Sequence, residues 1–274
     1  MESRDSLDLT PVQPVQPPAA YLGGKRNLAG RIAEQLRQVP HRTYVEPFVG
    51  MGGVFLRRPF RSQVEVINDR SRDVSNLFRI LQRHYVQLMD TLRWQITSRA
   101  EFERLQAAEA DTLTDLERAA RFLYLQRLSF GGKIEGRNFG VDPSTPGRFD
   151  VTKLGPVLDA VHERLAGMVI ECLPYEEAIR RYDRESTLFY LDPPYHGCEG
   201  DYLPGLFGPR DFDHMAAILA RVKGRFLVSL NDTPEVRRIF GRFSITAVDT
   251  TYSVAGGRRA GGAGEAKEVL ISGP

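Results

Sequence analysis

The stretch LFYLDPPY, residues 188–195, decides how this chain folds. Its apolar first half is typical of a buried strand, and the strand ends at an acid, two prolines and a tyrosine. Proline cannot donate to a strand ladder, so Asp192-Pro193-Pro194-Tyr195 is expected to form a stiff loop at the strand's carboxyl end. Open α/β sheets bind their ligands at this edge. The loop is therefore a candidate functional site.

Two segments upstream repeat the strand-to-loop pattern. Residues 43–48, TYVEPF, lead into the glycine-rich VGMGG, and residues 64–69, VEVIND, end at an acid. Glycines at such a turn let the backbone approach a ligand, although a plain tight turn would also use them. Asp69 is placed to accept hydrogen bonds from ribose hydroxyls, or to cap the following helix. This alternation predicts an α/β fold with a doubly wound sheet.

The alternation is interrupted between residues 71 and 149 and then resumes. Helical periodicity dominates up to about residue 127, and a glycine-rich segment near 129–148 is expected to form an irregular hairpin. We therefore predict a sheet domain of residues 21–70 and 150–274 with a mainly helical insertion at 71–149. Residues 1–20 are polar and rich in proline, which predicts a mobile tail, with a docking sequence as the alternative.

Composition narrows the class of protein. The 274 residues carry a net charge of +2 and two cysteines, so a reducing cytoplasm is expected and no disulfide framework. No apolar run reaches membrane-spanning length, and we expect no membrane partner. Basic residues gather between 118 and 148, which indicates either a surface that faces a polyanion or an ordinary solvated face.

The chemistry of the DPPY loop indicates a substrate class. Asp192 offers a carboxylate, Pro193 a backbone carbonyl and Tyr195 a ring, all held by the prolines. Two acceptors beside an aromatic ring suit an exocyclic amine on a flat base. A metal site built from Asp192, His196 and Cys198 is a competing interpretation, but a fourth ligand is missing nearby, so we expect no metal. A purely structural proline turn is the other alternative.

Several motifs together resemble the Dam type, D12 class, of DNA adenine-N6 methyltransferases. The similar segments are YLGGK (21–25), EPFVGMGGVFL (46–56), VINDRS (66–71), FLYLQRLSFGG (122–132), DPPY and KEVLIS (267–272), in the family's order. The resemblance implies a Rossmann-like S-adenosylmethionine-dependent sheet with an inserted recognition domain. It also implies methyl transfer to N6 of adenine in double-stranded DNA, after the base is flipped out of the helix, by a cytoplasmic enzyme of a bacterium or phage.

The resemblance also implies roles for individual residues. Catalysis falls to Asp192, Pro193, Pro194 and Tyr195. Contacts with S-adenosylmethionine are expected at Tyr21, Lys25, Glu46, Phe48, Gly50, Gly52, Asp69 and Asp192. A DNA contact is implied at Phe130. The basic residues of the glycine-rich segments, rather than the resemblance, predict further DNA contacts at Lys133 and Arg137, with Arg258 and Arg259 in the late glycine-rich loop as the next candidates.

One departure from the family affects specificity. Relatives that read GATC have an aromatic followed by Asn-Gly-Leu, whereas this chain has Phe130-Gly131-Gly132-Lys133, and Glu135 stands where an arginine is expected. GATC recognition is therefore not expected, and the segment resembles phage and prophage members more closely.

Two kinds of alternative remain: an enzyme that methylates a different amino group, and a protein without methyltransferase activity. They are a cytosine-N4, RNA-adenine or protein-glutamine methyltransferase, and a non-catalytic nucleic-acid-binding subunit on the same scaffold. Asp192 favours adenine, since cytosine-N4 enzymes more typically have Ser and glutamine enzymes Asn at this position. Cytosine-C5 chemistry requires a thiolate, and Cys198 lies beyond the motif. Binding of S-adenosylmethionine would exclude a dead binding module. The oligomeric state is left open.

Overall fold

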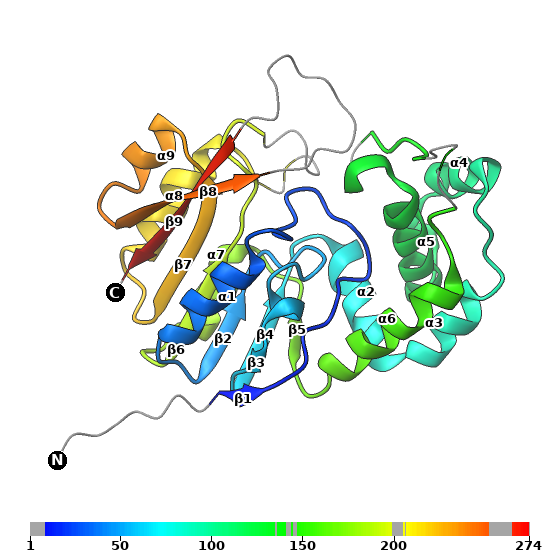
Figure 1. The fold of residues 1–274 in the computed structure, drawn as a ribbon, viewed down its shortest axis with the longest axis horizontal. Coiled ribbons are helices and arrows are strands. Elements are labelled where there is room, and N and C mark those ends of the chain that lie inside the picture. The colour runs from blue at the N-terminus through cyan, green and yellow to red at the C-terminus, as the bar shows by residue number, and fades with distance from the viewer. Residues whose placement is uncertain are drawn as a thin grey trace.

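The computed structural model describes residues 9–134, 136–140, 144, 147–198, 205, 207–251 and 265–273. A sheet of seven strands runs through the sheet domain in the order β5-β4-β2-β6-β7-β9-β8 (Figure 1). Its strands are β2 (Thr43–Glu46), β4 (Val64–Asn68), β5 (Val169–Glu171), β6 (Thr187–Leu191), β7 (Arg225–Asn231), β8 (Ser244–Thr251) and β9 (Glu265–Gly273).

The sheet is parallel except at β9, which lies antiparallel between β7 and β8. The chain order reverses between β2 and β6, because β2 connects toward β4 and β5 on one side while β6 leads to β7 on the other. In open α/β sheets such a reversal creates a crevice at the carboxyl ends of the two strands. The glycine-rich turn after β2 and the DPPY loop after β6 both open onto that crevice.

Alternate residues of the strands pack on opposite faces of the sheet. Tyr44 and Tyr190 belong to one buried cluster, whereas Val45, Phe189 and Leu191 belong to a second cluster. A parallel sheet covered on both faces requires this pattern. The period-two alternation within otherwise apolar strands therefore divides the core into two layers.

Helices cover both faces. The first cluster contains residues of α1 (Ala29–Gln38), α2 (Arg72–Arg83), α3 (Tyr85–Leu92), α4 (Arg99–Ala107), α5 (Asp115–Leu128) and α6 (Val151–Arg164). The second contains residues of α7 (Tyr175–Tyr182), α8 (Pro209–Leu219) and α9 (Pro234–Ile239). Short 3-10 turns occur at η1 (Phe55–Arg57), η2 (Ala110–Thr112) and η3 (Phe130–Gly132).

Helices α2 to α6 gather beside the β5 edge of the sheet, at the right of Figure 1. Four of them lie within residues 71–149, the segment predicted as a helical insertion. Helix α6 was assigned to the sheet domain, yet it packs against α2 and α3 through buried Leu154, Leu158 and Val161. The helical group therefore extends beyond residue 150.

The proline-rich N-terminal segment differs from the prediction. Residues 9–20 lie along the molecule: β1 (Thr10–Pro11) pairs antiparallel with β3 (Phe60–Arg61), and the Val15 amide donates to the Leu56 carbonyl at 2.8 Å. Ala19 is buried, and Leu9 and Val15 pack against the core. Residues 9–20, expected to be a mobile tail, are instead held in an extended segment by apolar side chains and backbone hydrogen bonds. Residues 1–8 lie outside the described part.

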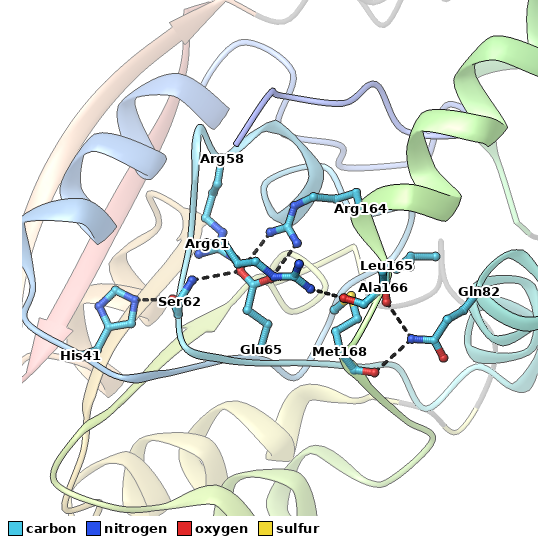
Figure 2. A network of polar contacts seen from close by, with 10 residues as sticks. All are labelled: His41, Arg58, Arg61, Ser62, Glu65, Gln82, Arg164, Leu165, Ala166 and Met168. Atoms are coloured by element: carbon cyan, nitrogen blue, oxygen red, sulfur yellow. Dashed lines mark hydrogen bonds and ion pairs between the residues drawn. The ribbon is translucent and has the colours of Figure 1, made fainter. Parts of the chain in front are cut away.

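A buried ionic cluster joins the helical group to the sheet (Figure 2). Glu65 on β4 binds Arg58 at 2.6 Å and, through both its oxygens, Arg164 at the end of α6. Burial opposes ionisation of Glu65, but Arg58 and Arg164 together outweigh it and hold its pKa below the ordinary value. Gln82 of α2 donates to the carbonyls of Leu165 and Met168, which fixes the chain leaving α6.

Within the described residues, no helix is both long enough and apolar enough to cross a membrane.

Candidate functional site

A cavity of about 470 Å³ opens at the crevice between β2 and β6. This volume lies within the range of roughly 300–1,000 Å³ typical of small-molecule sites. All predicted cofactor residues except Gly52 line it: Tyr21, Lys25, Glu46, Phe48, Gly50, Asp69 and Asp192, together with Pro194. Three of the acids follow or end adjacent parallel strands, which is why residues distant in sequence converge here.

The glycine-rich turn forms one wall of the cavity. Gly50 has a positive φ of 50°, and a Cβ there would lie 2.9 Å from the ring of Tyr21. Only glycine allows this backbone conformation together with so close an approach. The structure does not bring Gly52 to the cavity, because it turns toward the core, where a Cβ would meet Leu56 at 2.9 Å.

Asp69 connects this turn to the start of α2. Its Oδ2 accepts from the Gly50 amide at 2.9 Å, and its Oδ1 accepts from the Ser71 amide at 2.8 Å. Burial raises the pKa of Asp69 to about 6, although both hydrogen bonds oppose the shift. Asp69 thus holds the turn that precedes α2, whose N-cap residue is Ser71, and it lines the cavity.

Asp192 belongs to a cluster centred on Lys25. The Lys25 ammonium lies 2.7 Å from Oδ1 of Asp192 and donates to the Tyr195 hydroxyl at 2.8 Å. The Ser229 hydroxyl, on β7, also donates to Oδ1 at 2.9 Å. Burial raises the pKa of Asp192, against the opposing effects of Lys25 and Ser229. The acid is thus held by one oxygen, and the DPPY loop is joined to the YLGGK segment.

Tyr195 does not line the cavity but lies behind it. Its ring is 4.5 Å from the Lys25 ammonium, measured to the ring centroid, and its hydroxyl donates to Glu268 of β9. Sequence reasoning placed KEVLIS as a closing strand but did not single out Glu268 or Ser229. Glu268 lies in the KEVLIS motif, but Ser229 lies in no motif. Their contacts with the DPPY loop depend on the antiparallel placement of β9 and on the pairing of β7 with β6.

Glu46 is buried at the end of β2 and lines the cavity. The Tyr44 hydroxyl donates to its Oε2 at 2.7 Å. Burial raises the pKa of Glu46 to about 8, because the Tyr44 hydrogen bond and the charge of Arg58 only partly offset the desolvation. A cation bound beside Glu46 would favour the ionised carboxylate and lower this pKa.

Three aromatic rings stand together at one end of the cavity. Phe48 lies 5.3 Å from Tyr175 and 5.8 Å from Phe207, measured between ring centroids. All three line the cavity, which gives it an apolar wall for a flat ring. Only Phe48 was predicted from sequence. Tyr175 and Phe207 lie in segments that carry no motif, so nothing in their local sequence indicated this role.

The segment predicted as a hairpin is a short closed loop. Ser129 and Phe139 form a single antiparallel bridge, and the amides of Phe130 and Gly140 complete it by donating to Asn138 and Leu128. Gln126 of α5 donates to the carbonyls of both Gly132 and Ala20, and Ile134 lines the cavity. The loop therefore adjoins both the N-terminal segment and the cofactor site.

The predicted DNA-contacting residues differ in exposure. Phe130 is 37% exposed and Lys133 is exposed, whereas Arg137 is partly covered and donates to Gln126 and to the Lys133 carbonyl at 3.3 Å. Arg137 is thus held within its own loop. Arg258, Arg259 and Glu135 lie outside the described residues.

Among the described residues, no group of three metal-ligating side chains occurs. The residues of the alternative metal interpretation are arranged otherwise: the backbone of His196 is tied to Asn231, and its ring packs 5.1 Å from that of Phe212.

Comparison with protein families shows the class of enzyme to which this chain belongs. The family model of the D12 class N6 adenine-specific DNA methyltransferases matches residues 21–254. The chain belongs to this class. The resemblance of its motifs to Dam-type enzymes is thereby confirmed, and S-adenosylmethionine is its methyl donor.

Curated relatives cover nearly the whole chain of this D12 class enzyme. It is 23% identical to the type II methyltransferase M1.LlaDCHI of Lactococcus lactis subsp. cremoris over 278 residues, which are 94% of this chain and 95% of that protein. It is 28% identical to the DNA adenine methylase of Escherichia coli K12 over 255 residues, 87% of this chain and 90% of that protein. The DNA adenine methylase of Vibrio cholerae El Tor is 25% identical over 270 residues, with 91% and 93% covered.

The cavity of this D12 class enzyme fits the methyl donor by its chemistry. Carboxylates suit the sulfonium, the ammonium and the ribose hydroxyls, and the aromatic end suits the adenine ring. The ring of Tyr21 lies so close to Gly50 that no side chain fits there.

Proposed function

We propose that this chain is a site-specific methyltransferase that modifies adenine N6 in double-stranded DNA. The observation that carries this proposal is the joint placement of Asp192 and Lys25 beside a cavity of about 470 Å³. A carboxylate for the target amine and a site for the methyl donor then share one boundary. Methyl transfer requires little more than such positioning and electrostatics.

Asp192 is assigned to the target amino group. Lys25 and Ser229 both contact Oδ1, so Oδ2 and the neighbouring carbonyl of Pro193 are the acceptors that we assign to the two amine protons. Accepting these protons concentrates lone-pair density on N6 and orients it toward the cavity. When bound there, S-adenosylmethionine supplies an electrophilic methyl group. The ring of Tyr195 is assigned to the face of the adenine.

The other cavity residues are assigned to the methyl donor. We assign Glu46 and Asp69 to its ammonium and ribose ends, respectively, and Phe48 with Tyr175 to its adenine ring. Tyr21 and Gly50 close the cavity where the N-terminal segment meets the glycine-rich turn. These assignments follow the charge and shape of each wall.

An adenine inside a duplex is too far from a buried carboxylate to react, so we propose that the base is flipped out. The helices of residues 71–149 and the loop around Phe130 are assigned to DNA recognition. Lys133 is the leading basic contact because it is exposed, and Arg137 is assigned to shaping the loop. Arg258 and Arg259 are further candidates.

Long-read methylation mapping tests this proposal. A host without adenine methylation would express the wild-type protein or Asp192→Ala, and DNA from both would be sequenced. N6-methyladenine in a defined context, present with the wild type and missing with the variant, is the expected result. N4-methylcytosine instead would favour the cytosine alternative. If the wild-type protein binds S-adenosylmethionine but the genome carries no methylated base, DNA is not the substrate. RNA and protein amines would then be tested.

A further inference from the structure

We propose that Glu268 is a positioning residue for methyl transfer: it fixes Tyr195 and shares Lys25, and so keeps Asp192 available for the target amine. The proposal rests on the proposed function, because it assigns a role within the same site. Glu268 reaches the site from β9, a strand that enters the sheet on the side away from the glycine-rich turn.

The contacts form a closed set around one ammonium. The Lys25 Nζ lies 2.7 Å from Asp192 Oδ1 and 4.0 Å from Glu268 Oε2. The Tyr195 hydroxyl accepts from Lys25 at 2.8 Å and donates to Glu268 Oε1. With one hydrogen bond received and one given, the hydroxyl has a single orientation. The ring that we assign to the adenine face is therefore fixed from its far end.

The backbone around Glu268 is rigid. In the sheet it pairs with Asn231 of β7 and with Val248 of β8. The neighbouring strand positions Val269, Leu270 and Ile271 are buried and apolar. Glu268 can thus hold Tyr195 in one place, since a strand with partners on both sides does not shift easily.

A carboxylate at this position is unfavourable for stability. Glu268 is 1% exposed, and its Oε2 has no hydrogen-bond partner among the residues that the structure describes. A whole buried ion pair can often be replaced by apolar groups without loss of stability, so burial alone gives no reason for a carboxylate here. The contacts with Lys25 and Tyr195 do give one.

The charge arrangement gives Glu268 its second role. Lys25 is 2% exposed and faces two carboxylates, so its attraction is divided between Asp192 and Glu268. Without Glu268, Asp192 would be the only carboxylate facing Lys25, and the positive charge of Lys25 would act on Asp192 undivided. Asp192 would then be a weaker acceptor for the amine, and Tyr195 would lose its anchor.

The test compares Glu268→Gln, Glu268→Leu and the control Val269→Ala in the full chain, with kcat for adenine methylation, Kd for S-adenosylmethionine and Tm measured for each. Glu268→Leu should lower kcat about 10²-fold, as expected for a slight misplacement of reacting groups, while Kd changes less than about 3-fold. Its Tm should fall because Lys25 and Tyr195 lose a partner, and the control for lost stability is Val269→Ala. Glu268→Gln keeps the acceptor for Tyr195 and should retain more activity. Val269→Ala, in the core on the other face, should lower Tm without a selective loss of kcat.

A double-mutant cycle with Tyr195→Phe decides the route of the effect. If Glu268 acts through the Tyr195 hydroxyl, Glu268→Leu should cost far less kcat in the Tyr195→Phe background than in the wild type. Fully additive losses, a loss confined to cofactor affinity, or wild-type kcat in Glu268→Leu would each overturn the proposal. A wild-type protein that methylates no adenine would instead overturn the proposed function, so the two failures are distinguishable.

Discussion

Asp192 combines an ion pair with Lys25 and a hydrogen bond from Ser229 on the same oxygen. Asp192→Ala should lower kcat for methyl transfer at least about 10³-fold, because a preorganised polar contact to the reacting group is commonly worth about 10² to 10³ or more. Single-turnover methyl transfer measures this, with circular dichroism to verify folding. Near-wild-type turnover by a folded variant would contradict the mechanism.

Asp69 provides a second residue-scale prediction. Asp69→Ala should weaken binding of S-adenosylmethionine about 10-fold or more, since losing a charge-assisted hydrogen bond costs roughly 1.5–3 kcal/mol. Calorimetry measures the change, and Asp69→Asn is the matched control because it retains one acceptor for the Gly50 or Ser71 amide. Unchanged affinity in Asp69→Ala would reduce this acid to a helix cap.

Glu46 predicts a pH dependence of cofactor binding. Its pKa is raised from 4.5 to about 8, so the ligand-free carboxyl is mostly protonated at neutral pH and loses its proton when a cation binds beside it. Affinity for S-adenosylmethionine should therefore rise between about pH 6 and pH 8. The same shift makes the ligand-free protein lose stability as the pH rises over that range, because the folded state holds the proton more tightly than the unfolded state.

Calorimetry of cofactor binding in two buffers of different ionisation enthalpy would measure the released proton. Glu46→Gln should bind without that release and with a flatter pH profile. Equal heats in both buffers for the wild type would show that Glu46 is not coupled to the ligand.

Some residues of the site could be predicted from the sequence, and others could not. Asp192, Lys25 and Asp69 were predicted because each stands in a motif beside a strand end or a glycine-rich turn. Glu268, Ser229 and Tyr175 were not. Glu268 and Ser229 reach the site through the pairing of β9 with β7 and of β7 with β6, and Tyr175 reaches it from helix α7, so their local sequence did not indicate the contacts.

At the scale of elements, the loop closed by Ser129 and Phe139 carries the residues that we expect to contact DNA. Lys133→Ala should lower methylation similarly in all contexts and reduce the salt dependence of DNA binding, because an exposed lysine on a glycine-rich loop suits phosphate better than base edges. Methylation mapping and binding at several salt concentrations measure both effects.

Arg137→Ala is the companion variant. Because Arg137 donates to Gln126 and the Lys133 carbonyl, its loss should disturb the loop itself. A changed set of methylated sequences with Lys133→Ala would instead make Lys133 a base-reading residue. If neither variant alters methylation or DNA affinity, the assignment of this loop is wrong.

Whether a segment is a helix or a strand was easier to predict than which other segments it packs against. The strands and helices of the sheet domain follow from periodicity, as the burial of alternate residues in β2 and β6 illustrates. The course of residues 9–20 did not follow, because an extended proline-rich segment has no internal pattern. Its position is set by a few apolar side chains and by contacts far along the chain: the Val15 amide donates to the Leu56 carbonyl, and the Pro18 carbonyl accepts from Arg127.

At the scale of the whole molecule, the Glu65 cluster joins the helical group to the sheet. Glu65→Gln should reduce the free energy of unfolding by about 3–5 kcal/mol, because it leaves the buried charges of Arg58 and Arg164 without an anion. Urea denaturation measures this. Asp111→Asn, which affects an exposed pair with Arg72 and Arg118, should leave stability nearly unchanged.

Lowering the pH should reduce the difference in unfolding free energy between the wild type and Glu65→Gln. The pKa of Glu65 is lowered in the folded state, so its contribution is present at neutral pH and is lost as the pH falls through that lowered value. A difference that stays constant into strong acid would show that Glu65 acts by shape rather than by charge.

Because β9 lies between β7 and β8, this side of the sheet cannot form until β9 has been synthesised. Ribosomes make β7 and β8 first, yet each pairs with β9, and β8 stands at the edge with β9 as its neighbour in the sheet. Until residues 265–273 have left the ribosome, the edge of β7 is open and β8 has no place in the sheet. Open strand edges invite pairing with other chains. A premature stop before Glu265 would therefore remove one strand from the sequence but two from the sheet, and leave a nascent protein prone to aggregate.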